Sequence, residues 1–249
     1  MAESELVLER LFAAGASIVV RSLLITPARA ERIEPFLQAQ VSSQPEHEHV
    51  EVFVAPQAVI DAVVGYPLHR GVIAVAERPA PRTPNSVFAL ARTLVVLEQV
   101  MDPDNVGSVF RHAAGFGADA VVLHGPCGDP LYRKTIRTSM GWTLHVPYAN
   151  TALGEQSISA VLREAGFTTL ALTPAGDAND LADVVSALTP TDRVALLLGA
   201  EGPGLTPQAI ADANHRVRIP LRAGVDSLNV ATAGAIALYA LTSAHPARI

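Results

Sequence analysis

Cysteine is almost absent from this sequence, aromatic residues are scarce, and long apolar runs are missing. Cys127 is the single cysteine in 249 residues, which excludes an internal disulfide and fits a reducing compartment. No apolar run reaches the length of about eighteen residues that a membrane-spanning helix needs, so none is predicted. The first residues are acidic rather than basic and carry no secretory signal. We therefore expect a cytoplasmic protein with no membrane partner.

An excess of positive charge is also missing. The formal net charge is −6, and a negative chain cannot coat nucleic acid broadly, because phosphates are neutralised by clustered cations. Two local basic clusters exist, at Arg133, Lys134 and Arg137 and at Arg216, Arg218 and Arg222. Either cluster is also compatible with ordinary solvated surface. Charge alone therefore does not decide whether the protein binds RNA.

A proline-rich stretch divides the chain. Pro79, Pro81 and Pro84 interrupt the hydrophobic pattern and predict a linker over 79–86, between a domain at 1–78 and another at 87–249. In the first domain, expected helices alternate with expected strands, which is typical of a small α/β module. We expect helices at 6–14, 29–40 and 57–64 and strands at 18–25, 50–54 and 71–76.

Beyond the linker, short β-branched runs alternate with helical patterns. This alternation predicts an α/β domain with a mostly parallel sheet. We expect its strands at 93–97, 120–123, 144–146, 168–172, 194–198 and 217–219. Ligands of open parallel sheets bind at the carboxyl ends of the strands, and polar or glycine-rich turns follow several of these strands. These turns are where a functional site is expected.

The first such segment reads DPDNVGSVFRH, from Asp102 to His112. Asp104 or Asn105 can cap the helix that follows, and Asn105 and Arg111 then lie within about two turns of its start. An ordinary capped helix accounts for the apolar residues, which face a core. It does not account for the Asn-x-Gly-x-x-x-Arg spacing.

The second segment, LLLGAEGPGL, runs from Leu196 to Leu205. A buried strand leads directly into three glycines around Glu201, and glycines let backbone amides approach a ligand closely. The segment lacks the ending of a phosphate-binding Walker loop and the spacing of a dinucleotide fingerprint. A tight turn into a helix that starts at Thr206 and Pro207 is an equally good interpretation.

The third segment, from Arg218 to Leu241, predicts a short strand, a polar turn and an alanine-rich helix that begins near Ser227. Ser227 and Asn229 would offer a hydroxyl, an amide and free backbone N–H groups to a ligand at the helix start. A plain N-cap role for Ser227 is the alternative.

Together and in this order, the three segments resemble the three motifs of the SpoU (TrmH-type) RNA 2′-O-ribose methyltransferases of the SPOUT superfamily. The resemblance implies a deep trefoil knot in the C-terminal part, S-adenosylmethionine (AdoMet) as cofactor, no metal, and a homodimer that methylates a ribose 2′-hydroxyl of RNA. The 1–78 module, through residues 67–72, resembles the L30e-like RNA-binding domain of many family members. Its first residues resemble an internal point of that domain, so we expect a truncated start. This domain favours 23S rRNA over tRNA as the substrate.

The resemblance also implies site residues. The catalytic positions are Asn105, Arg111, Glu201 and Asn229. The cofactor-binding positions are Thr173, Leu198, Gly199, Gly202, Ile219, Leu221, Ser227 and Leu228. An arginine, with a pKa above about 12, is a poor general base, so we expect Arg111 to position a phosphate and stabilise alkoxide charge. It could act in its own subunit or across the dimer. His112 departs from the family pattern and is assigned no role.

Other classes of function stay open at this stage. A non-catalytic RNA-binding or ribosome-assembly protein of the same fold is the main alternative, and the intact motif residues argue against it. A nicotinamide-dependent oxidoreductase is disfavoured by the missing fingerprint. The run Glu46-His47-Glu48-His49 indicates polar surface rather than a metal site. The sequence identifies neither the RNA nor the nucleotide, and it does not separate a housekeeping role from antibiotic resistance.

Overall fold

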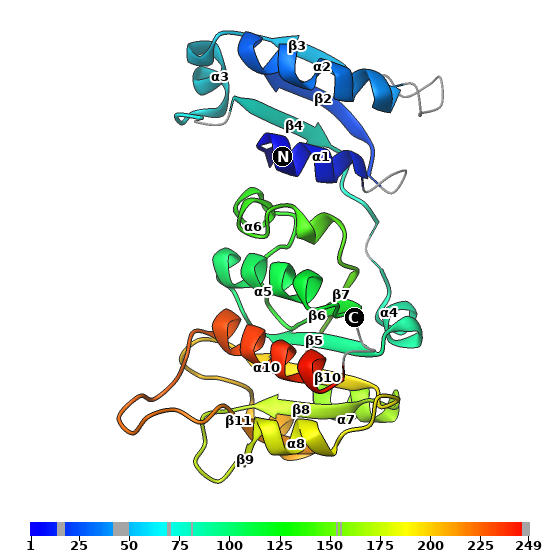
Figure 1. Cartoon of the computed structure of the whole chain (residues 1–249), viewed down its shortest axis with the longest axis vertical. Helices are drawn as coiled ribbons and strands as arrows, with labels where there is room; N and C mark the ends of the chain where they lie inside the picture. The colour runs from blue at the N-terminus through cyan, green and yellow to red at the C-terminus, as the bar shows by residue number, and fades with distance from the viewer. Residues whose placement is uncertain are drawn as a thin grey trace.

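The structure is a computed structural model that describes residues 1–13, 18–41, 50–68, 71–80, 82–152, 154 and 156–245, with the backbone alone for 35–41. These residues form a four-stranded sheet from the N-terminal part and a seven-stranded sheet from the rest of the chain. Figure 1 shows the two sheets following one another along the long axis, with the short helix α6 (Arg133–Thr138) between them. Residues 69–70 of the proposed L30e-like signature and the run Glu46–His49 lie outside the described residues.

The N-terminal sheet has the order β1-β4-β2-β3, with β4 antiparallel to both β1 and β2 and β3 parallel to β2. Its strands are β1 (Ala2–Glu3), β2 (Val20–Ile25), β3 (Glu51–Val54) and β4 (Val72–Ala76), and its helices are α1 (Glu5–Ala13), α2 (Pro27–Val41) and α3 (Gln57–Val64). Val7, Leu8 and Leu11 of α1 belong to the same buried hydrophobic cluster as Leu23 and Ile25 of β2. The small α/β module is present as predicted. Only β1 was not predicted, because two residues carry no periodic pattern.

The C-terminal sheet has the order β7-β6-β5-β10-β8-β11-β9, and every neighbouring pair is parallel. Its strands are β5 (Thr93–Glu98), β6 (Ala120–His124), β7 (Tyr148–Thr151), β8 (Thr168–Leu172), β9 (Asn179–Asp180), β10 (Val194–Gly199) and β11 (His215–Arg218). This confirms the predicted α/β class with a parallel sheet. The strands β5 and β6 are buried throughout because helices cover both faces, which explains their unbroken apolar runs.

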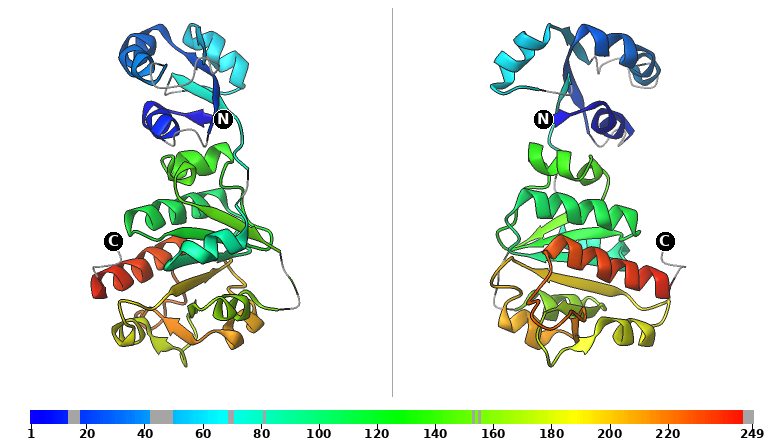
Figure 2. Two further views of the ribbon diagram at one scale, coloured as in Figure 1. Left: turned by 90° about the vertical axis from the view of Figure 1, so that its right-hand side faces the viewer. Right: turned by 60° about the vertical axis from the view of Figure 1, so that its left-hand side comes forward.

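The helices of this part are α4 (Pro84–Leu90), α5 (Pro103–Gly115), α6, α7 (Ile158–Glu164), α8 (Leu181–Ala187), α9 (Pro207–Asp212) and α10 (Val230–Ala244), with the 3-10 turn η2 (Trp142–Leu144). Figure 2 shows α5 and α10 on the same face of the sheet, where they pack against one another. Among the described residues, no helix combines the length and the apolar character required to cross a bilayer.

The strand predicted at 144–146 is wrong. Gly141 adopts a left-handed φ of 85° and opens the turn η2, and the Val146 amide closes it by donating to the Trp142 carbonyl at 2.9 Å. The strand begins only after Pro147, whose carbonyl accepts from Val121 on β6 at 2.9 Å. Local hydrogen bonds therefore override the β-branched composition of this stretch.

The end of the predicted linker is also helical. Pro84 stands in the first turn of α4, where a missing N–H costs nothing, and the Thr83 hydroxyl accepts from Ser86 N at 3.3 Å. A proline at this position starts a helix rather than preventing one. The last predicted strand lies slightly earlier than expected, at 215–218. The domain boundaries themselves stay a prediction.

Several side-chain contacts join the N-terminal part to α6 and η2. The Glu3 side chain, only 5% exposed, pairs with Arg133 of α6 and accepts from the Tyr66 hydroxyl at 2.6 Å. The Arg133 guanidinium in turn lies 4.2 Å from the centre of the Tyr66 ring. Arg10 of α1 stacks 4.4 Å from the centre of the Trp142 ring. These contacts hold β1 and α1 against α6 and η2, so the linker is not the sole connection between the two parts.

Replacing Arg133 by Ala should therefore destabilise the protein. Glu3 would stay buried with Tyr66 as its remaining partner, and we expect a loss of about 2 kcal/mol in the free energy of unfolding, measured in urea. The control is Arg21→Ala, whose partner Glu77 is 50% exposed, and which should cost less than about 1 kcal/mol. Equal losses in the two variants would show that the Glu3 contact contributes nothing special.

Candidate active site

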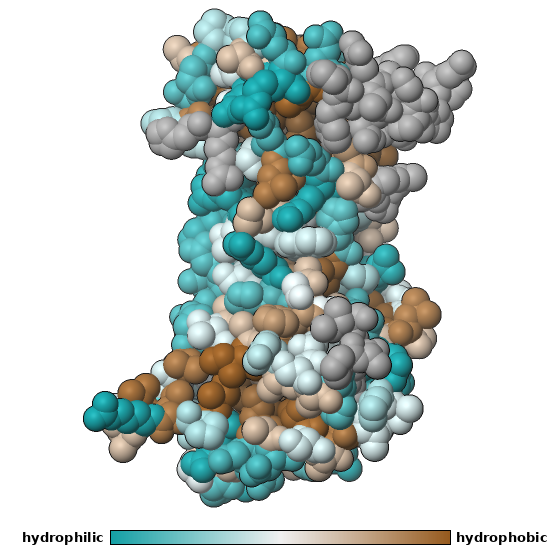
Figure 3. Space-filling model, viewed as in Figure 1, coloured by the Kyte–Doolittle hydropathy of each residue, from teal (hydrophilic) through white to brown (hydrophobic). Residues whose placement is uncertain are grey.

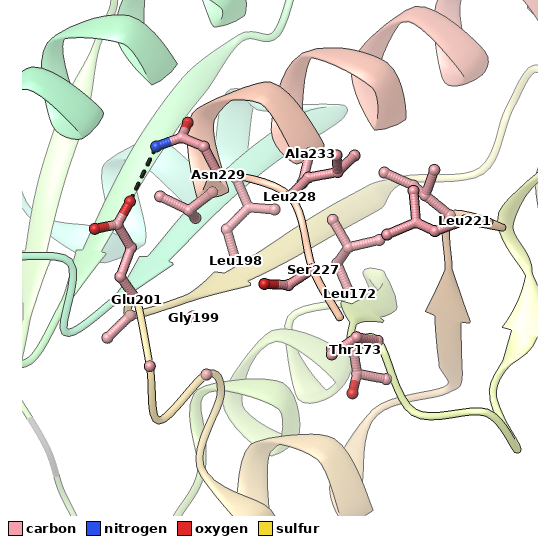
Figure 4. Close-up of a pocket in the computed structure, with 16 residues that line it drawn as sticks. Leu172, Thr173, Leu198, Gly199, Glu201, Leu221, Ser227, Leu228, Asn229 and Ala233 are labelled. Atoms are coloured by element: carbon pink, nitrogen blue, oxygen red, sulfur yellow. Dashed lines mark hydrogen bonds between the residues drawn. The ribbon is translucent and has the colours of Figure 1, made fainter. Parts of the chain in front are cut away.

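A cavity of about 350 Å³ opens at the carboxyl ends of β8 and β10 and beside the loop that follows β11. Figure 4 shows side chains from these three segments and from the start of α10 around it. Its lining residues are Leu172, Thr173, Pro174, Leu198, Gly199, Ala200, Glu201, Gly202, Gly204, Ile219, Leu221, Ser227, Leu228, Asn229, Val230 and Ala233. All eight residues predicted to bind the cofactor are among them. The site lies where ligands of parallel sheets bind.

The backbone at Gly199 explains why the second segment is rich in glycine. The chain leaves β10 at Gly199 and folds back so closely that a Cβ there would lie 2.1 Å from the Gly204 carbonyl carbon and from Leu205 N. The Gly204 amide donates to the Ala200 carbonyl at 2.9 Å, which closes the loop. Gly202 and Gly204 have φ values of 87° and 72°, a region that favours glycine. Only glycine at position 199 permits this loop.

Three of the predicted catalytic residues meet at the edge of the cavity. The Asn105 amide donates to Glu201 Oε1 at 2.9 Å, and the Asn229 amide donates to the same oxygen at 2.9 Å and to Asn105 Oδ1 at 2.8 Å. Figure 4 shows Asn229 and Glu201 joined in this way. The three residues come from three separate segments of the chain. We call them the polar triad.

Helix α5 carries Asn105 to the triad, and the cap of this helix lies two residues before the first of the two predicted caps. The cap is Asp102, which accepts from Asp104 N at 2.8 Å, and Pro103 follows it at the first helical position. The predicted caps, Asp104 and Asn105, are therefore wrong. Since Asn105 is not needed as a cap, its amide, 6% exposed, is available to Glu201.

Helix α10 starts at Val230 and is capped by Asn229 rather than by Ser227. Asn229 Oδ1 accepts from Ala231 N at 3.0 Å and from Thr232 N at 3.2 Å. Its amide group remains available to donate to the other two members of the triad. Ser227 instead lines the cavity. One residue thus fixes both the helix start and the site.

Glu201 is the one ionisable residue among those that line the cavity within the described residues. Its two hydrogen-bond donors are neutral amides, and it forms no ion pair with any described residue. An uncompensated carboxylate beside a mostly apolar cavity favours a ligand that carries positive charge.

Arg111, the fourth predicted catalytic residue, does not join the triad. It is exposed on α5 and is not among the residues that line the cavity. Its positive charge lies close to Arg10 of α1, where it adds to the effect of burial in lowering the pKa of Arg10. Within the described part of the chain, Arg111 makes no hydrogen bond or ion pair. Its guanidinium is therefore free to meet a group from outside this chain.

His112 is a residue of α5 and faces the first turn of α10. Burial lowers its pKa, the Ala231 carbonyl opposes this shift, and the charge of Arg111 lowers the pKa further. Its Nδ1 atom is buried without a partner among the described residues. Burial therefore favours the neutral imidazole, which packs as a contact between the two helices.

Two other potential sites give no support for chemistry. Cys127 is half-buried, its Sγ donates to the Leu97 carbonyl at 3.3 Å, and burial raises the pKa of its thiol. A thiol of this kind is a weak nucleophile. Among the described residues, no group of three His, Cys, Asp or Glu side chains could hold a metal ion.

The start of α10 was predicted to contribute to the site, but its residues Val230 and Ala233 were not. Val230 and Ala233 line the cavity, and a Cβ at Gly234 would lie 2.7 Å from Leu198 Cδ1. Helix α10 therefore packs directly on the end of β10. The signal was the run of small residues in this helix, which permits close approach but has no motif of its own.

The Asn229 substitutions should separate its two roles. Asn229→Asp keeps an oxygen that can cap α10 but places two carboxylates together, so we expect near-normal stability with loss of activity. Asn229→Ala should lose activity and, in addition, about 1 kcal/mol of the free energy of unfolding, because the cap is removed. Urea unfolding of both variants checks this result. Equal stability of the alanine variant and the wild type would contradict the cap assignment.

Comparison with known proteins places this site in a family. A profile of the SpoU rRNA Methylase family matches residues 92–239. An uncharacterized tRNA/rRNA methyltransferase of Mycobacterium bovis is 50% identical over 184 residues, which cover 74% of this chain and 63% of that protein's length. The 23S rRNA (guanosine-2′-O-)-methyltransferase RlmB of a Burkholderia species is 28% identical over 225 residues, 88% of this chain and 87% of that protein.

The fold also matches a solved structure. An AdoMet-bound rRNA methyltransferase from Sinorhizobium meliloti superposes with a TM-score of 0.76 at 24% identity, covering 97% of this chain and 85% of that one. This likeness extends over both sheets. The family profile covers the polar triad and the entire lining of the cavity. The chain belongs to the SpoU rRNA Methylase family.

Proposed function

We propose that this protein transfers the methyl group of AdoMet to a ribose 2′-hydroxyl of RNA. The observation that carries the proposal is the polar triad of Asn105, Glu201 and Asn229 at the edge of a cavity that Gly199 helps to line. Family membership supports the reaction class, and the similarity to RlmB supports the 2′-oxygen as the acceptor.

The cavity suits AdoMet in size and in charge. Its volume of about 350 Å³ lies at the lower end of the range for small-molecule sites. The side chains of Leu172, Leu198 and Leu228 offer an apolar surface for the adenine ring, while Thr173 and Ser227 offer hydroxyls. We assign cofactor binding to Thr173, Leu198, Gly199, Gly202, Ile219, Leu221, Ser227 and Leu228. We extend the proposal to the deep trefoil knot of the family, formed by the backbone around this cavity.

AdoMet would supply an electrophilic methyl group and leave as S-adenosylhomocysteine, while the protein positions the acceptor oxygen and the hydroxyl proton passes to solvent water. We assign positioning to the polar triad, whose hydrogen bonds fix the direction of the Glu201 carboxylate. Arg111 is assigned to the RNA, where its guanidinium holds a phosphate and stabilises negative charge on the attacking oxygen. Because Arg111 lies away from the cavity of its own chain, we propose that it serves the site of a second subunit.

The RNA we propose is 23S rRNA rather than tRNA. The Burkholderia relative is named for 23S rRNA, and the alignment with it extends into the N-terminal part of this chain. We propose residues 1–78 as an RNA-binding domain and the cytoplasm as the location of the reaction. The contacts of Glu3 and Arg10 with α6 and η2 would hold that domain in a fixed relation to the site.

We also propose a homodimer that uses α10. Ile236 and Tyr239 are 38% and 61% exposed on one side of this helix, and Figure 3 shows hydrophobic atoms gathered over the start of α10 and the loop before it. An exposed apolar surface that becomes buried between two subunits is the usual basis of a permanent interface. Tyr239→Glu should convert the dimer to a monomer in sedimentation-velocity experiments. A wild-type chain that sediments as a monomer would contradict the dimer.

Calorimetry tests the cofactor. The wild-type protein should bind AdoMet and its product S-adenosylhomocysteine but neither NAD nor NADP. Binding of a nicotinamide cofactor in place of AdoMet would overturn the proposal in favour of an oxidoreductase. Absence of binding by any of the four compounds would favour a non-catalytic RNA-binding protein of the same fold.

A further inference from the structure

Glu98 is a buried carboxylate outside the cavity that none of the proposed steps uses. It is the last residue of β5, is 2% exposed, and lies in register between Gly199 of β10 and His124 of β6. Both of its oxygens accept hydrogen bonds from one residue. Oε2 accepts from Thr206 N at 2.7 Å, and Oε1 accepts from the Thr206 hydroxyl at 3.0 Å.

Burying the Glu98 carboxylate has an unfavourable desolvation free energy. A carboxylate taken out of water loses its hydration, and within the described residues Glu98 forms no ion pair that would compensate. The Thr206 hydroxyl donates to Glu98 and also accepts from Ala209 N at 3.2 Å, so the same side chain caps α9. One buried pair therefore joins the end of β5 to the start of α9.

The pair closes the loop that carries Glu201. That loop leaves β10 at Gly199, is bridged between Ala200 and Gly204, and ends at Thr206. Glu201 lies within it. The strand that carries Glu98 continues, a few residues later, into the helix that carries Asn105. Glu98 thus connects the segment that delivers Asn105 to the loop that delivers Glu201.

We propose that Glu98 is a positioning residue for the methyl-transfer site, acting through Thr206 on the loop of residues 200–205. This inference rests on the proposed function, since it assigns that loop to AdoMet binding and to the polar triad. Glu98 is not among the residues that line the cavity, and within the described residues it makes no hydrogen bond to the polar triad. Its role is to hold the loop in the one arrangement in which Glu201 receives both amide donors.

The test compares Thr206→Val, Thr206→Ser and Glu98→Ala with the wild type. Thr206→Val removes the hydroxyl bond to Glu98, and we expect the Kd for AdoMet to rise about tenfold, as a loss of ~1.4 kcal/mol produces. Amide hydrogen exchange of residues 200–205 should become faster in the same variant. Thr206→Ser restores the hydroxyl and should return both quantities to near wild-type values. Glu98→Ala should reproduce the Thr206→Val result.

The matched control is Thr83→Val. Thr83 also caps a helix and precedes a proline, as Thr206 does, but it is exposed and makes no hydrogen bond to Glu98 among the described residues. The Thr83→Val variant should lose a similar amount of the free energy of unfolding through loss of the helix cap, and its Kd for AdoMet should not change. An unchanged Kd in Thr206→Val, in a protein whose wild type binds AdoMet, would overturn the role of Glu98. A wild type that does not bind AdoMet would overturn the proposed function instead. If Glu98→Ala does not fold, the two Thr206 variants still decide.

Discussion

Gly199→Ala should abolish measurable AdoMet binding. The added Cβ would lie 2.1 Å from two backbone atoms of Gly204 and Leu205, a distance that no side-chain rotation can relieve. The loop must therefore move away from β10, and Glu201 moves with it. We expect a rise in the Kd of more than about a hundredfold, equivalent to ~2.7 kcal/mol, in calorimetric titration.

A matched control separates this effect from a general cost of added volume. Gly176→Ala places the same methyl group in the loop after β8, near the cavity, where a Cβ would meet no atom within 4 Å. It should bind AdoMet as the wild type does. Near-UV circular dichroism should show that both variants keep their tertiary packing. A folded Gly199→Ala variant with the wild-type Kd would mean that the cavity is not the cofactor site.

Arg111→Ala should reduce methyl transfer by about a thousandfold and leave AdoMet binding unchanged. Arg111 is exposed and is not among the residues that line the cavity, so we expect its removal to leave the lining in place. Removal of one charge-stabilising donor typically costs about 10²–10³ in kcat. The control is Arg163→Ala, an exposed arginine on α7 that donates to the Asp212 carbonyl at 3.0 Å. Full activity of Arg111→Ala would remove it from the mechanism.

Mixing the two inactive variants tests whether Arg111 acts across the dimer. In a mixed dimer, an Arg111→Ala subunit still supplies an intact cavity, and a Gly199→Ala subunit still supplies an intact Arg111. If Arg111 serves the partner's site, refolding the two variants together should restore part of the activity. If it serves its own site, the mixture should be as inactive as either variant alone.

The fold could be predicted to the extent that hydrophobic periodicity determines it. The parallel strands β5 and β10 are buried on both faces, so their apolar runs are unbroken and easy to recognise. The stretch 144–146 was misread because a glycine in the left-handed region and a following proline, rather than composition, decide its local structure. The helix start at Pro84 was missed for a related reason, since a proline interrupts a helix but also begins one.

The site could be predicted in part, because three ordered motifs resemble one family. Their residues meet at one edge of the sheet, with Asn105, Glu201 and Asn229 in direct contact. The observed helix caps, Asp102 and Asn229, were not the predicted ones. Several neighbouring residues can cap a helix, and only tertiary contacts select one. The Glu98–Thr206 contact joins residues 108 positions apart, and no local sequence pattern predicts such a pair.

The position of Arg111 shows a different limit. Its place in the motif predicts a role at the site, yet in the folded chain it is exposed and apart from the triad. A sequence motif indicates which residues act together, but it does not indicate which subunit each residue belongs to. The second subunit that we propose would reconcile the motif with the geometry.

The central claim is tested most directly by methyl transfer to RNA. Purified protein is incubated with radiolabelled AdoMet and either 23S rRNA or tRNA, and the labelled RNA is mapped for alkali-resistant ribose methylation. We expect label at a 2′-oxygen of 23S rRNA, absent with the Arg111→Ala variant. Absence of transfer to either RNA by a protein that binds AdoMet, or label on a base instead of a ribose, would contradict the account.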